Sequence, residues 1–348
     1  MDKLATLFGG GVIGDAVALV ASILIVVGFI TVYAMFAIWL ERKASADFQS
    51  RLGPMRVGAH GWAQSIADGL KLAFKEDIIP ADADKFLFWI APAVVFAGAL
   101  ATFVAIPVAA GWQVVDLNIG LFYILAIAST GVIGVIMAGW ASNNKWSLYG
   151  AMREAAQLVS YEIPSGLALL VPILVVGSFR LQDIVEFQAR HTWLLFYSPF
   201  TLIAFIIYYI ASLAECKRAP FDLPEAESEL VSGFHTEYSG LRFSFFFLEE
   251  YAMMFVVSAI ATTLFLGGWQ PLPFVSFALP GAAAAAIFIA KCVFLVWVQM
   301  WVRWTLPRLR VDQVMTLGYK YLVPFAFLAL VGIAIYVDRG WQWIPGIF

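Results

Sequence analysis

The sequence predicts an all-α polytopic membrane protein, in which residues 1–348 form a single membrane domain with about eight transmembrane helices. Its composition gives the first reason: 62% of the residues are hydrophobic and 13% are charged, whereas a soluble domain has roughly 45–50% apolar and about 25% charged residues. The second reason is a series of apolar runs, each close to the about 20 residues that a spanning helix needs. Together they exclude a soluble globular enzyme, and a net charge of −3 gives no indication of nucleic-acid binding.

The apolar runs place the predicted spans along the chain. They lie at about 16–40, 86–110, 119–142, 153–178, 197–214, 243–270, 279–302 and 320–337. Several contain Pro or Gly, which membrane helices tolerate where neighbouring groups satisfy the backbone. The first run is not expected to be a cleaved signal peptide, because it is long, lacks a basic region before it and ends in Glu41-Arg42-Lys43.

The basic residues predict the orientation in the membrane. Most Lys and Arg residues fall in the loops that follow the first, third, fifth and seventh predicted spans. By the positive-inside rule these loops are cytoplasmic, and eight spans then place both termini on the outer side. The longest of them, residues 41–85 and 215–242, also carry most of the polar chemistry.

Residues 60–75 are predicted to form an amphipathic helix at the cytoplasmic interface. At 100° per residue, Trp62, Ile66, Leu70 and Phe74 fall within one arc, opposite Lys71 and other polar residues. The segment is too short and too charged to span the bilayer. It is either a structural support or one wall of an opening through which a lipid-like molecule leaves the bilayer.

Carboxylates mark the start of the fourth predicted span. Glu154 and Tyr161 fall on one helix face, and Glu162 lies eight residues beyond Glu154, about 12 Å along the axis. A carboxylate at that depth is costly and indicates function. The alternative is a structural ion pair with a basic residue of a neighbouring span, for which Lys291 is a candidate.

The loop over residues 215–242, the acidic loop, adds a second group of carboxylates. Its acids are Glu215, Asp222, Glu225, Glu227, Glu229 and Glu237, and the next span carries Glu249-Glu250. Together with Glu162 they predict a proton path from the cytoplasmic surface into the membrane, since each transfer must be short or bridged by water. The prediction requires the fourth, fifth and sixth spans to pack together, and a merely solvated acidic loop is the alternative.

No metal or cofactor site is predicted on this chain. Cys216 and Cys292 are its only cysteines, and two sulfurs cannot ligate an iron–sulfur cluster or complete a structural zinc site. Gly9, Gly11 and Gly14 match G-x-G-x-x-G, but no strand precedes them, so a dinucleotide site is not expected. Electron carriers would therefore belong to other chains or to a diffusible ligand.

Three blocks of sequence resemble one known family. They read ERKASADFQSRLGPMRVGAHGWAQSIADGLKLAFKED, REAAQLVSYEIP, and RAPFDLPEAESELVSGFHTEYSG with the following FFFLEEY. These blocks resemble a membrane subunit of respiratory complex I, the H subunit of NADH–quinone oxidoreductase (mitochondrial ND-one type), over nearly the whole chain. One departure is Met55, where the family commonly has Asn after Gly53-Pro54, so the loop here lacks that side-chain amide.

The resemblance implies a subunit of a proton-translocating NADH:quinone oxidoreductase with no catalytic residue, metal or bound cofactor of its own. Quinone would be the substrate, and FMN and iron–sulfur clusters would belong to partner subunits. The implied partners are the hydrophilic quinone-site subunits B, D and I, the membrane subunits A, J and K, and the lipid bilayer. The implied location is the bacterial cytoplasmic (inner) membrane, with both termini periplasmic.

The resemblance also implies two sets of site residues. The quinone-tunnel set comprises Glu41, Arg42, Arg51, Gly53, Pro54, Trp62, Lys71 and Phe74. The proton-path set comprises Glu154, Tyr161, Glu162, Glu215, Asp222, Glu225, Glu227, Glu229, Glu249 and Glu250.

Two other functions compete with this interpretation. The related membrane subunit of a membrane-bound hydrogenase tends to carry Val-Asp-Asn-Pro where this chain has Phe-Asp222-Leu-Pro, so the intact loop favours complex I. A stand-alone ion transporter would usually show repeat symmetry and paired broken helices, and neither is clear in this sequence.

Overall fold

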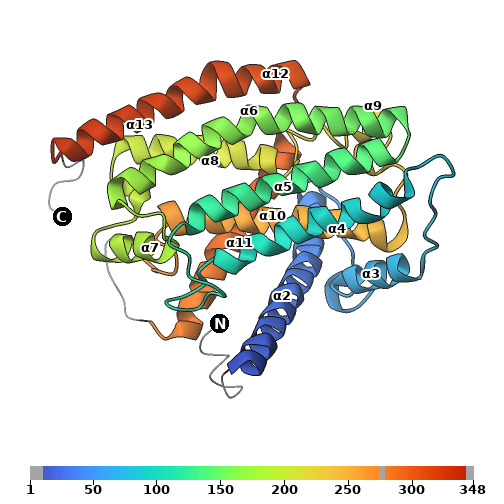
Figure 1. The fold of residues 1–348 in the computed structure, drawn as a ribbon, viewed down its shortest axis with the longest axis horizontal. Coiled ribbons are helices and arrows are strands. Elements are labelled where there is room, and N and C mark those ends of the chain that lie inside the picture. Colours follow the sequence, from blue (N-terminus) through green and yellow to red (C-terminus); the bar gives the residue numbers. More distant parts are fainter. Residues whose placement is uncertain (1–10, 274–278, 342–348) are drawn as a thin grey trace.

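The computed structural model of the chain describes residues 11–273 and 279–341, apart from the side chains of residues 11–13 and 227. Gly9, the first glycine of the G-x-G-x-x-G match, lies outside these ranges. Within them the chain is helical, and its β-structure is limited to a single bridge between Ala109 and Trp112. The predicted all-α class is therefore confirmed (Figure 1).

Seven helices of the described ranges are long and apolar enough to cross a membrane. They are α2 (Gly11–Phe48), α4 (Lys85–Thr102), α5 (Gly120–Ala141), α6 (Lys145–Val176), α10 (Gly240–Phe265), α11 (Gly281–Thr305), and the run from α12 (Val311–Thr316) through a π-helical turn (Leu317–Leu322) into α13 (Val323–Asp338). The remaining predicted span, the fifth (197–214), corresponds to α8 (Pro199–Glu215), an apolar helix of 17 residues, or about 25 Å.

Local sequence signals explain where these helices begin and end. Asn144 caps α6 by accepting a hydrogen bond from the Trp146 backbone N–H at 2.9 Å, so α6 begins well before the predicted residue 153. It ends at Gly177, whose φ of 76° suits glycine. Before α8, the Ser198 hydroxyl accepts from the Thr201 backbone N–H at 3.1 Å.

The helix of the first predicted span extends beyond residue 40, where the span was predicted to end. Helix α2 continues through Glu41-Arg42-Lys43 and ends at Phe48. No Gly or Pro interrupts the chain there, and Ala44, Ser45 and Ala46 are buried, so packing extends the helix beyond the charged triplet. As a result Glu41 lies on a rigid helix rather than in a loop.

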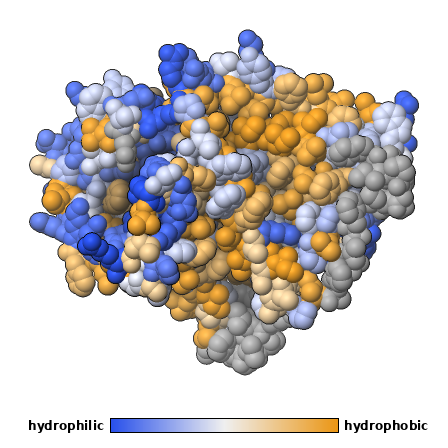
Figure 2. Space-filling view, turned by 180° about the vertical axis from the view of Figure 1, so that it is seen from behind, coloured by the Kyte–Doolittle hydropathy of each residue, from blue (hydrophilic) through white to orange (hydrophobic). Residues whose placement is uncertain are grey.

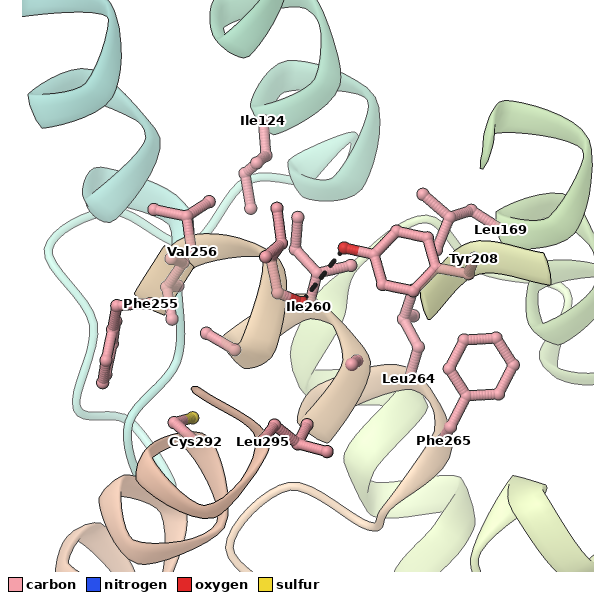
Figure 3. Close-up of a cluster of buried hydrophobic side chains, with 14 of the residues drawn as sticks. Ile124, Leu169, Tyr208, Phe255, Val256, Ile260, Leu264, Phe265, Cys292 and Leu295 are labelled. Atoms are coloured by element: carbon pink, nitrogen blue, oxygen red, sulfur yellow. Dashed lines mark hydrogen bonds between the residues drawn. The ribbon is translucent and has the colours of Figure 1, made fainter. Parts of the chain in front are cut away.

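Helix α10 lies at the centre of the molecule and packs against α2, α4, α6, α8 and α11. Figure 1 shows α2 crossing at a steep angle on one side and α12–α13 lying along the opposite side. The contacts of α10 with α6 and α8 confirm that the fourth, fifth and sixth predicted spans pack together. In the core, the Tyr208 hydroxyl of α8 donates to the Val257 carbonyl of α10 at 3.1 Å (Figure 3).

The polar and apolar surfaces are separated along the molecule. Figure 2 shows hydrophilic residues gathered at one end and a broad apolar surface over the rest of that face. The polar end carries α3 (Gln64–Phe74), α9 (Glu227–Leu230) and the acidic loop. We call it the inner end, because it is the end predicted to be cytoplasmic.

The opposite, outer end carries a helix that the sequence analysis missed. Helix α7 (Leu181–Arg190) buries Leu181, Ile184, Val185 and Gln188 against the bundle. Its apolar residues recur at helical spacing, a signal that was available in the sequence but is short and weak next to the long apolar runs.

Candidate functional site

The predicted amphipathic helix is present as α3, preceded by a 3₁₀ turn at Ala59–Gly61. Its polar side holds it to α2: the Ser65 hydroxyl donates to the Met35 carbonyl at 3.0 Å, and Asp68 lies 2.7 Å from Arg42. Its apolar side faces outward, and the Phe74 side chain is 87% exposed. An exposed apolar face beside a spanning helix is typical of a helix lying in the membrane interface.

A cluster of buried charges joins the inner ends of α2, α10 and α11. The Glu41 carboxylate accepts hydrogen bonds from Arg218 Nη1 at 2.8 Å and from the Tyr251 hydroxyl at 2.6 Å, and it also pairs with Arg303. Arg218 Nε lies 2.5 Å from Glu250 Oε1, and its guanidinium group lies 4.6 Å from the Tyr251 ring centre. We call these residues the Glu41 cluster.

A second buried cluster lies beside the first and joins α6 to α10. Lys217 Nζ lies 3.2 Å from Glu249 Oε2 and 4.0 Å from Glu154 Oε1. Glu154 is 0% exposed, and neither of its carboxylate oxygens has a hydrogen-bond partner. Among the described side chains, Lys217 is the cation within ion-pair distance of Glu154. We call these three residues the Glu249 cluster.

Two neighbouring residues of the acidic loop supply the cations of the two clusters. Lys217 has a φ of 54°, in the left-handed region, so the chain turns sharply after α8 and directs Lys217 and Arg218 to different partners. On α10 the facing acids Glu249 and Glu250 are also consecutive, about 100° apart around the helix. Adjacent cations of the loop therefore face adjacent acids of α10.

Carboxylates outnumber cations at this site. Among the described side chains, the buried carboxylates are Glu41, Glu154, Glu249 and Glu250, and the buried Lys and Arg residues are Lys217 and Arg218. Burial would lower the pKa of Lys217, but the charges of Glu249 and Glu154 raise it above its ordinary value. Burial would likewise lower the pKa of Arg218, and Glu250 and Glu41 raise it. Both cations therefore stay charged and hold the carboxylates together.

The rest of the acidic loop continues this charge network to the surface. Glu225 Oε1 lies 3.4 Å from His235 Nε2; burial would raise the pKa of Glu225, but the interaction with His235 outweighs it, and the pKa lies below its ordinary value. Burial raises the pKa of Asp222 to about 6, although Arg308 lies 3.2 Å away and opposes the shift. Glu229 pairs with Arg153 at 2.7 Å.

A cavity of about 300 Å³ opens onto the Glu41 cluster, near the lower limit of ligand pockets. It lies between α2, α10, α11 and the acidic loop. Its lining combines charged residues with aromatic ones, including Glu41, Arg218, His235, Glu250, Tyr251, Phe243, Phe247 and Trp304. This cavity, called the inner cavity below, could hold a polar ring with its charged or hydrogen-bonding groups against Arg218, Tyr251 or His235.

The predicted quinone-tunnel residues fall into two groups. Glu41 and Arg42 line the inner cavity. The others lie outside its lining: Arg51 bonds to Gln49 at 2.6 Å, Gly53 and Pro54 belong to the loop packed against α2 and Gly61, and Trp62, Lys71 and Phe74 are exposed on or beside α3.

The predicted proton-path residues are mostly brought together. Glu154, Tyr161, Glu249 and Glu250 are buried, Glu215 and Glu225 are partly buried, and Asp222 and Glu229 lie at the surface end. The Glu227 side chain lies outside the described residues.

The structure gives Glu162 other neighbours than Lys291, the candidate for a structural ion pair. The Glu162 side chain is exposed on the outer surface of this chain, where it accepts a hydrogen bond from the Ser129 hydroxyl at 2.5 Å. Lys291 is not its partner: Lys291 Nζ donates to the carbonyls of Leu266 and Gly268 at 2.6 and 3.0 Å. Sequence spacing gave the depth of Glu162 but could not give the direction in which it points.

Sequence reasoning missed the cations of the site. Lys217, Arg218 and Arg303 contribute to the positive charge of the predicted cytoplasmic loops and look like ordinary interfacial residues. The available signal was the position of Lys217-Arg218 directly after Glu215 at the end of a span. Within residues 11–273 and 279–341, no group of three His, Cys, Asp or Glu side chains could hold a metal ion.

Comparison with known proteins gives consistent matches. Residues 20–334 match the NADH dehydrogenase family. The chain is 49% identical to the H subunit of NADH-quinone oxidoreductase from Anaeromyxobacter dehalogenans, covering 90% of this chain and 81% of that protein. It is 51% identical to the corresponding protein of Chlorobium luteolum, covering 89% and 86%, and 47% identical to that of Bacteroides fragilis, covering 90% and 89%.

Proposed function

The chain belongs to the NADH dehydrogenase family, together with the H subunits of NADH-quinone oxidoreductase, and we propose that its two buried charge clusters link quinone reduction to proton movement. Its relatives are membrane subunits of a proton-translocating enzyme complex. This chain is accordingly a multi-pass membrane subunit of that kind. The relatives favour this function over the hydrogenase and stand-alone transporter alternatives.

The observation that carries the proposal is the shared connection of the two clusters. Arg218 lines the inner cavity and pairs with Glu41 and Glu250, whereas the adjacent Lys217 pairs with Glu249 and Glu154. A change of charge in the cavity acts on Arg218 first. Because the two cations are consecutive in the chain, the change is then passed to the carboxylates that face α6.

The inner cavity fits the final part of a quinone path. A quinone has a polar ring and a long apolar tail, so it needs an apolar route that ends at hydrogen-bonding groups. The exposed apolar face of α3 supplies a route from the bilayer, and Tyr251, Arg218 and His235 supply polar groups. In this proposal the tunnel residues Arg51, Gly53, Pro54, Trp62, Lys71 and Phe74 shape the mouth, while Glu41 and Arg42 line the inner end.

Reduction of the quinone provides the driving change in charge. Electrons arriving from FMN and iron–sulfur clusters of partner subunits leave negative charge on the quinone until it takes up protons. That charge attracts Arg218 and Arg303 away from Glu41 and Glu250. Carboxylates that lose a cation in a low-dielectric site take up protons, and Glu225, Glu227 and Glu229 of the acidic loop supply them from the surface.

The path would leave this chain at Glu162. An exposed carboxylate in a spanning helix is costly in lipid, so a partner with a polar group is expected to cover Glu162 and Ser129. We assign this contact to the membrane subunits A, J or K, and the inner end to the hydrophilic subunits B, D and I. The protein would lie in the bacterial inner membrane with both termini periplasmic, as the positive-inside rule predicts.

The replacement Glu249→Gln tests the proposal, with Glu186→Gln as its matched control. Glu186 lies on α7 at the outer end and pairs with the exposed Arg190 at 3.6 Å. Membranes carrying each variant would be assayed for NADH oxidation with quinone and with ferricyanide, which accepts electrons early in the hydrophilic arm. We expect Glu249→Gln to lower the quinone rate about tenfold or more, as for lost proton transfer, with the ferricyanide rate unchanged. Equal quinone rates and equal proton pumping in both variants would refute the proposal.

A further inference from the structure

A short strap, residues 306–310, connects α11 to α12 and lies against the acidic loop. The Leu309 backbone N–H donates to the Pro220 carbonyl at 2.9 Å. Next to it, Arg308 Nη2 lies 3.2 Å from Asp222 Oδ2 and Arg308 Nη1 lies 3.2 Å from the Ser228 hydroxyl oxygen. The strap therefore holds the loop by one backbone contact and one side chain.

Arg308 bridges the two ends of the acidic-loop segment that contains Glu225. Its two anchor points, Asp222 and Ser228, lie on either side of Glu225, which pairs with His235 beside the inner cavity. Arg308 Nη1 is also 3.9 Å from Glu229 Oε1, and Arg153 of α6 holds Glu229 from the other side at 2.7 Å. The stretch that carries Glu225 is thus fixed at both of its ends.

The neighbouring arginine of the strap provides a natural contrast. Arg308 is only 26% exposed, whereas Arg310 is 75% exposed and bonds to Asp312, two residues away, at 2.9 Å. A local pair between exposed groups contributes little. A partly buried guanidinium group with acceptors in two parts of a distant loop restricts that loop.

We propose that Arg308 is a positioning residue for the acidic loop. Its guanidinium group, called the latch below, binds Asp222 and α9 to the strap and so fixes the position of Glu225 relative to the Glu41 and Glu249 clusters. This proposal rests on the proposed function, because the position of Glu225 matters only if the loop passes charge. The latch acts through Glu225 and does not itself touch quinone.

The geometry also explains why arginine is needed at this position. Nη2 reaches Asp222 while Nη1 reaches Ser228 and Glu229, so the planar group serves both anchor points at once. A lysine ammonium is a point charge and can serve one anchor well but not both. Arg308→Lys should therefore restore part of what Arg308→Met loses.

The test uses the whole complex in native membranes, with the variants Arg308→Met, Arg308→Lys, Arg310→Met and Glu225→Gln. We expect Arg308→Met to lower kcat for quinone reduction about tenfold, with KM for quinone and the ferricyanide rate little changed. Amide hydrogen exchange over residues 221–232 should be faster than in wild type. Arg308→Lys should give a kcat and an exchange rate between those of Arg308→Met and wild type, and Arg310→Met should match wild type in both.

Separate outcomes overturn the latch and the proposed function. If Glu225→Gln is impaired while Arg308→Met matches Arg310→Met in rate and exchange, the latch is wrong and the proposed function stands. If Glu225→Gln and Arg308→Met both keep wild-type quinone rates, the loop does not pass charge and the proposed function fails. A loss of assembled complex in Arg308→Met with a normal rate per assembled complex would make Arg308 a purely structural residue and refute the latch.

Discussion

At its outer end α10 finishes among an amide, backbone groups and one lysine, whereas at its inner end it lies among paired acids and cations. The outer end is bound by Gln188 of α7, whose side-chain N–H donates to the Thr263 carbonyl at 2.8 Å and whose carbonyl oxygen accepts from the Leu194 and Gly267 backbone N–H groups at 3.0 Å. Lys291 adds hydrogen bonds to the next carbonyls and lies 4.1 Å from the Trp193 ring centre.

The inner end of α10 has a different balance. Lys217 pairs with Glu249 and Glu154, and Arg218 pairs with Glu250 and Glu41, so each of these two cations serves two carboxylates. Hydrogen bonds to backbone groups, as at the outer end, fix one arrangement, because any change breaks them. A network with too few cations has several arrangements of similar energy. One helix can therefore be anchored outside and respond to charge inside.

Replacing Arg218 should give the largest loss of stability, because it removes the main cation of the Glu41 cluster at the inner end. Arg218→Met leaves Glu41 and Glu250 buried without their main cation, which costs about 3–5 kcal/mol when one partner of a buried pair is lost. We expect a large drop in assembled complex and in its unfolding temperature. The control is Arg42→Met, which breaks the 43% exposed pair with Asp68 and should cost about 1 kcal/mol or less. Similar losses in both variants would contradict the buried cluster.

Replacing Lys291 at the outer end should give a smaller loss of stability and leave quinone reduction unaffected, unlike a change at the inner end. Lys291→Met leaves the carbonyls of Leu266 and Gly268 without their donor, at a cost of about 1–3 kcal/mol. The unfolding temperature should fall, while the pH profile of quinone reduction should stay as in wild type. Lys145→Met, at the exposed start of α6, should change neither. A shifted pH profile in Lys291→Met would show that the outer end also takes part in coupling.

The smallest predicted effect concerns pH at the edge of the inner end. Burial and nearby Glu225 raise the pKa of Asp222 from 3.8 to about 6, against the opposing charges of Arg308 and Arg218. Because the folded pKa is the higher one, the neutral acid stabilises the fold at low pH, and this stabilisation is lost as the pH rises through about 6. Asp222→Asn stays neutral, so it should exceed wild type in stability by about 1–2 kcal/mol at pH 7 and by little at pH 4. Thermal melts of both proteins between pH 4 and 7 measure this stability difference. A difference that does not change with pH would contradict the raised pKa of Asp222.

The sequence was sufficient for the spans because span length and hydropathy are local properties. The seven long apolar helices of the described residues, and the shorter α8, each coincide with a predicted span. The helix predicted over 60–75 is also present, as α3. The sequence did not reveal that α2 continues past residue 40 as a helix, because burial of Ala44 to Ala46 depends on tertiary packing. It also overlooked α7, whose signal covers only 10 residues.

The sequence identified the carboxylates of the site, but it could not identify the cations with which they form ion pairs. Glu41 and Arg218 are 177 residues apart in the chain, and no local pattern links them. Glu249 and Glu250 lie about 100° apart on α10, and both are buried, with Glu249 facing Lys217 and Glu250 facing Arg218. Helix rotation decides where Glu162 and Lys291 point, and that rotation is set by neighbouring helices rather than by the residues themselves.

The most direct test of the central claim is an infrared difference spectrum of the complex, reduced minus oxidised, in the carboxyl region. If the inner end of α10 responds to quinone reduction, the spectrum should contain a carboxyl band that Glu249→Gln removes and Glu186→Gln retains. A spectrum with the same carboxyl bands in wild type and Glu249→Gln would mean that the inner end stays as fixed as the outer end, and the account of coupling would be wrong.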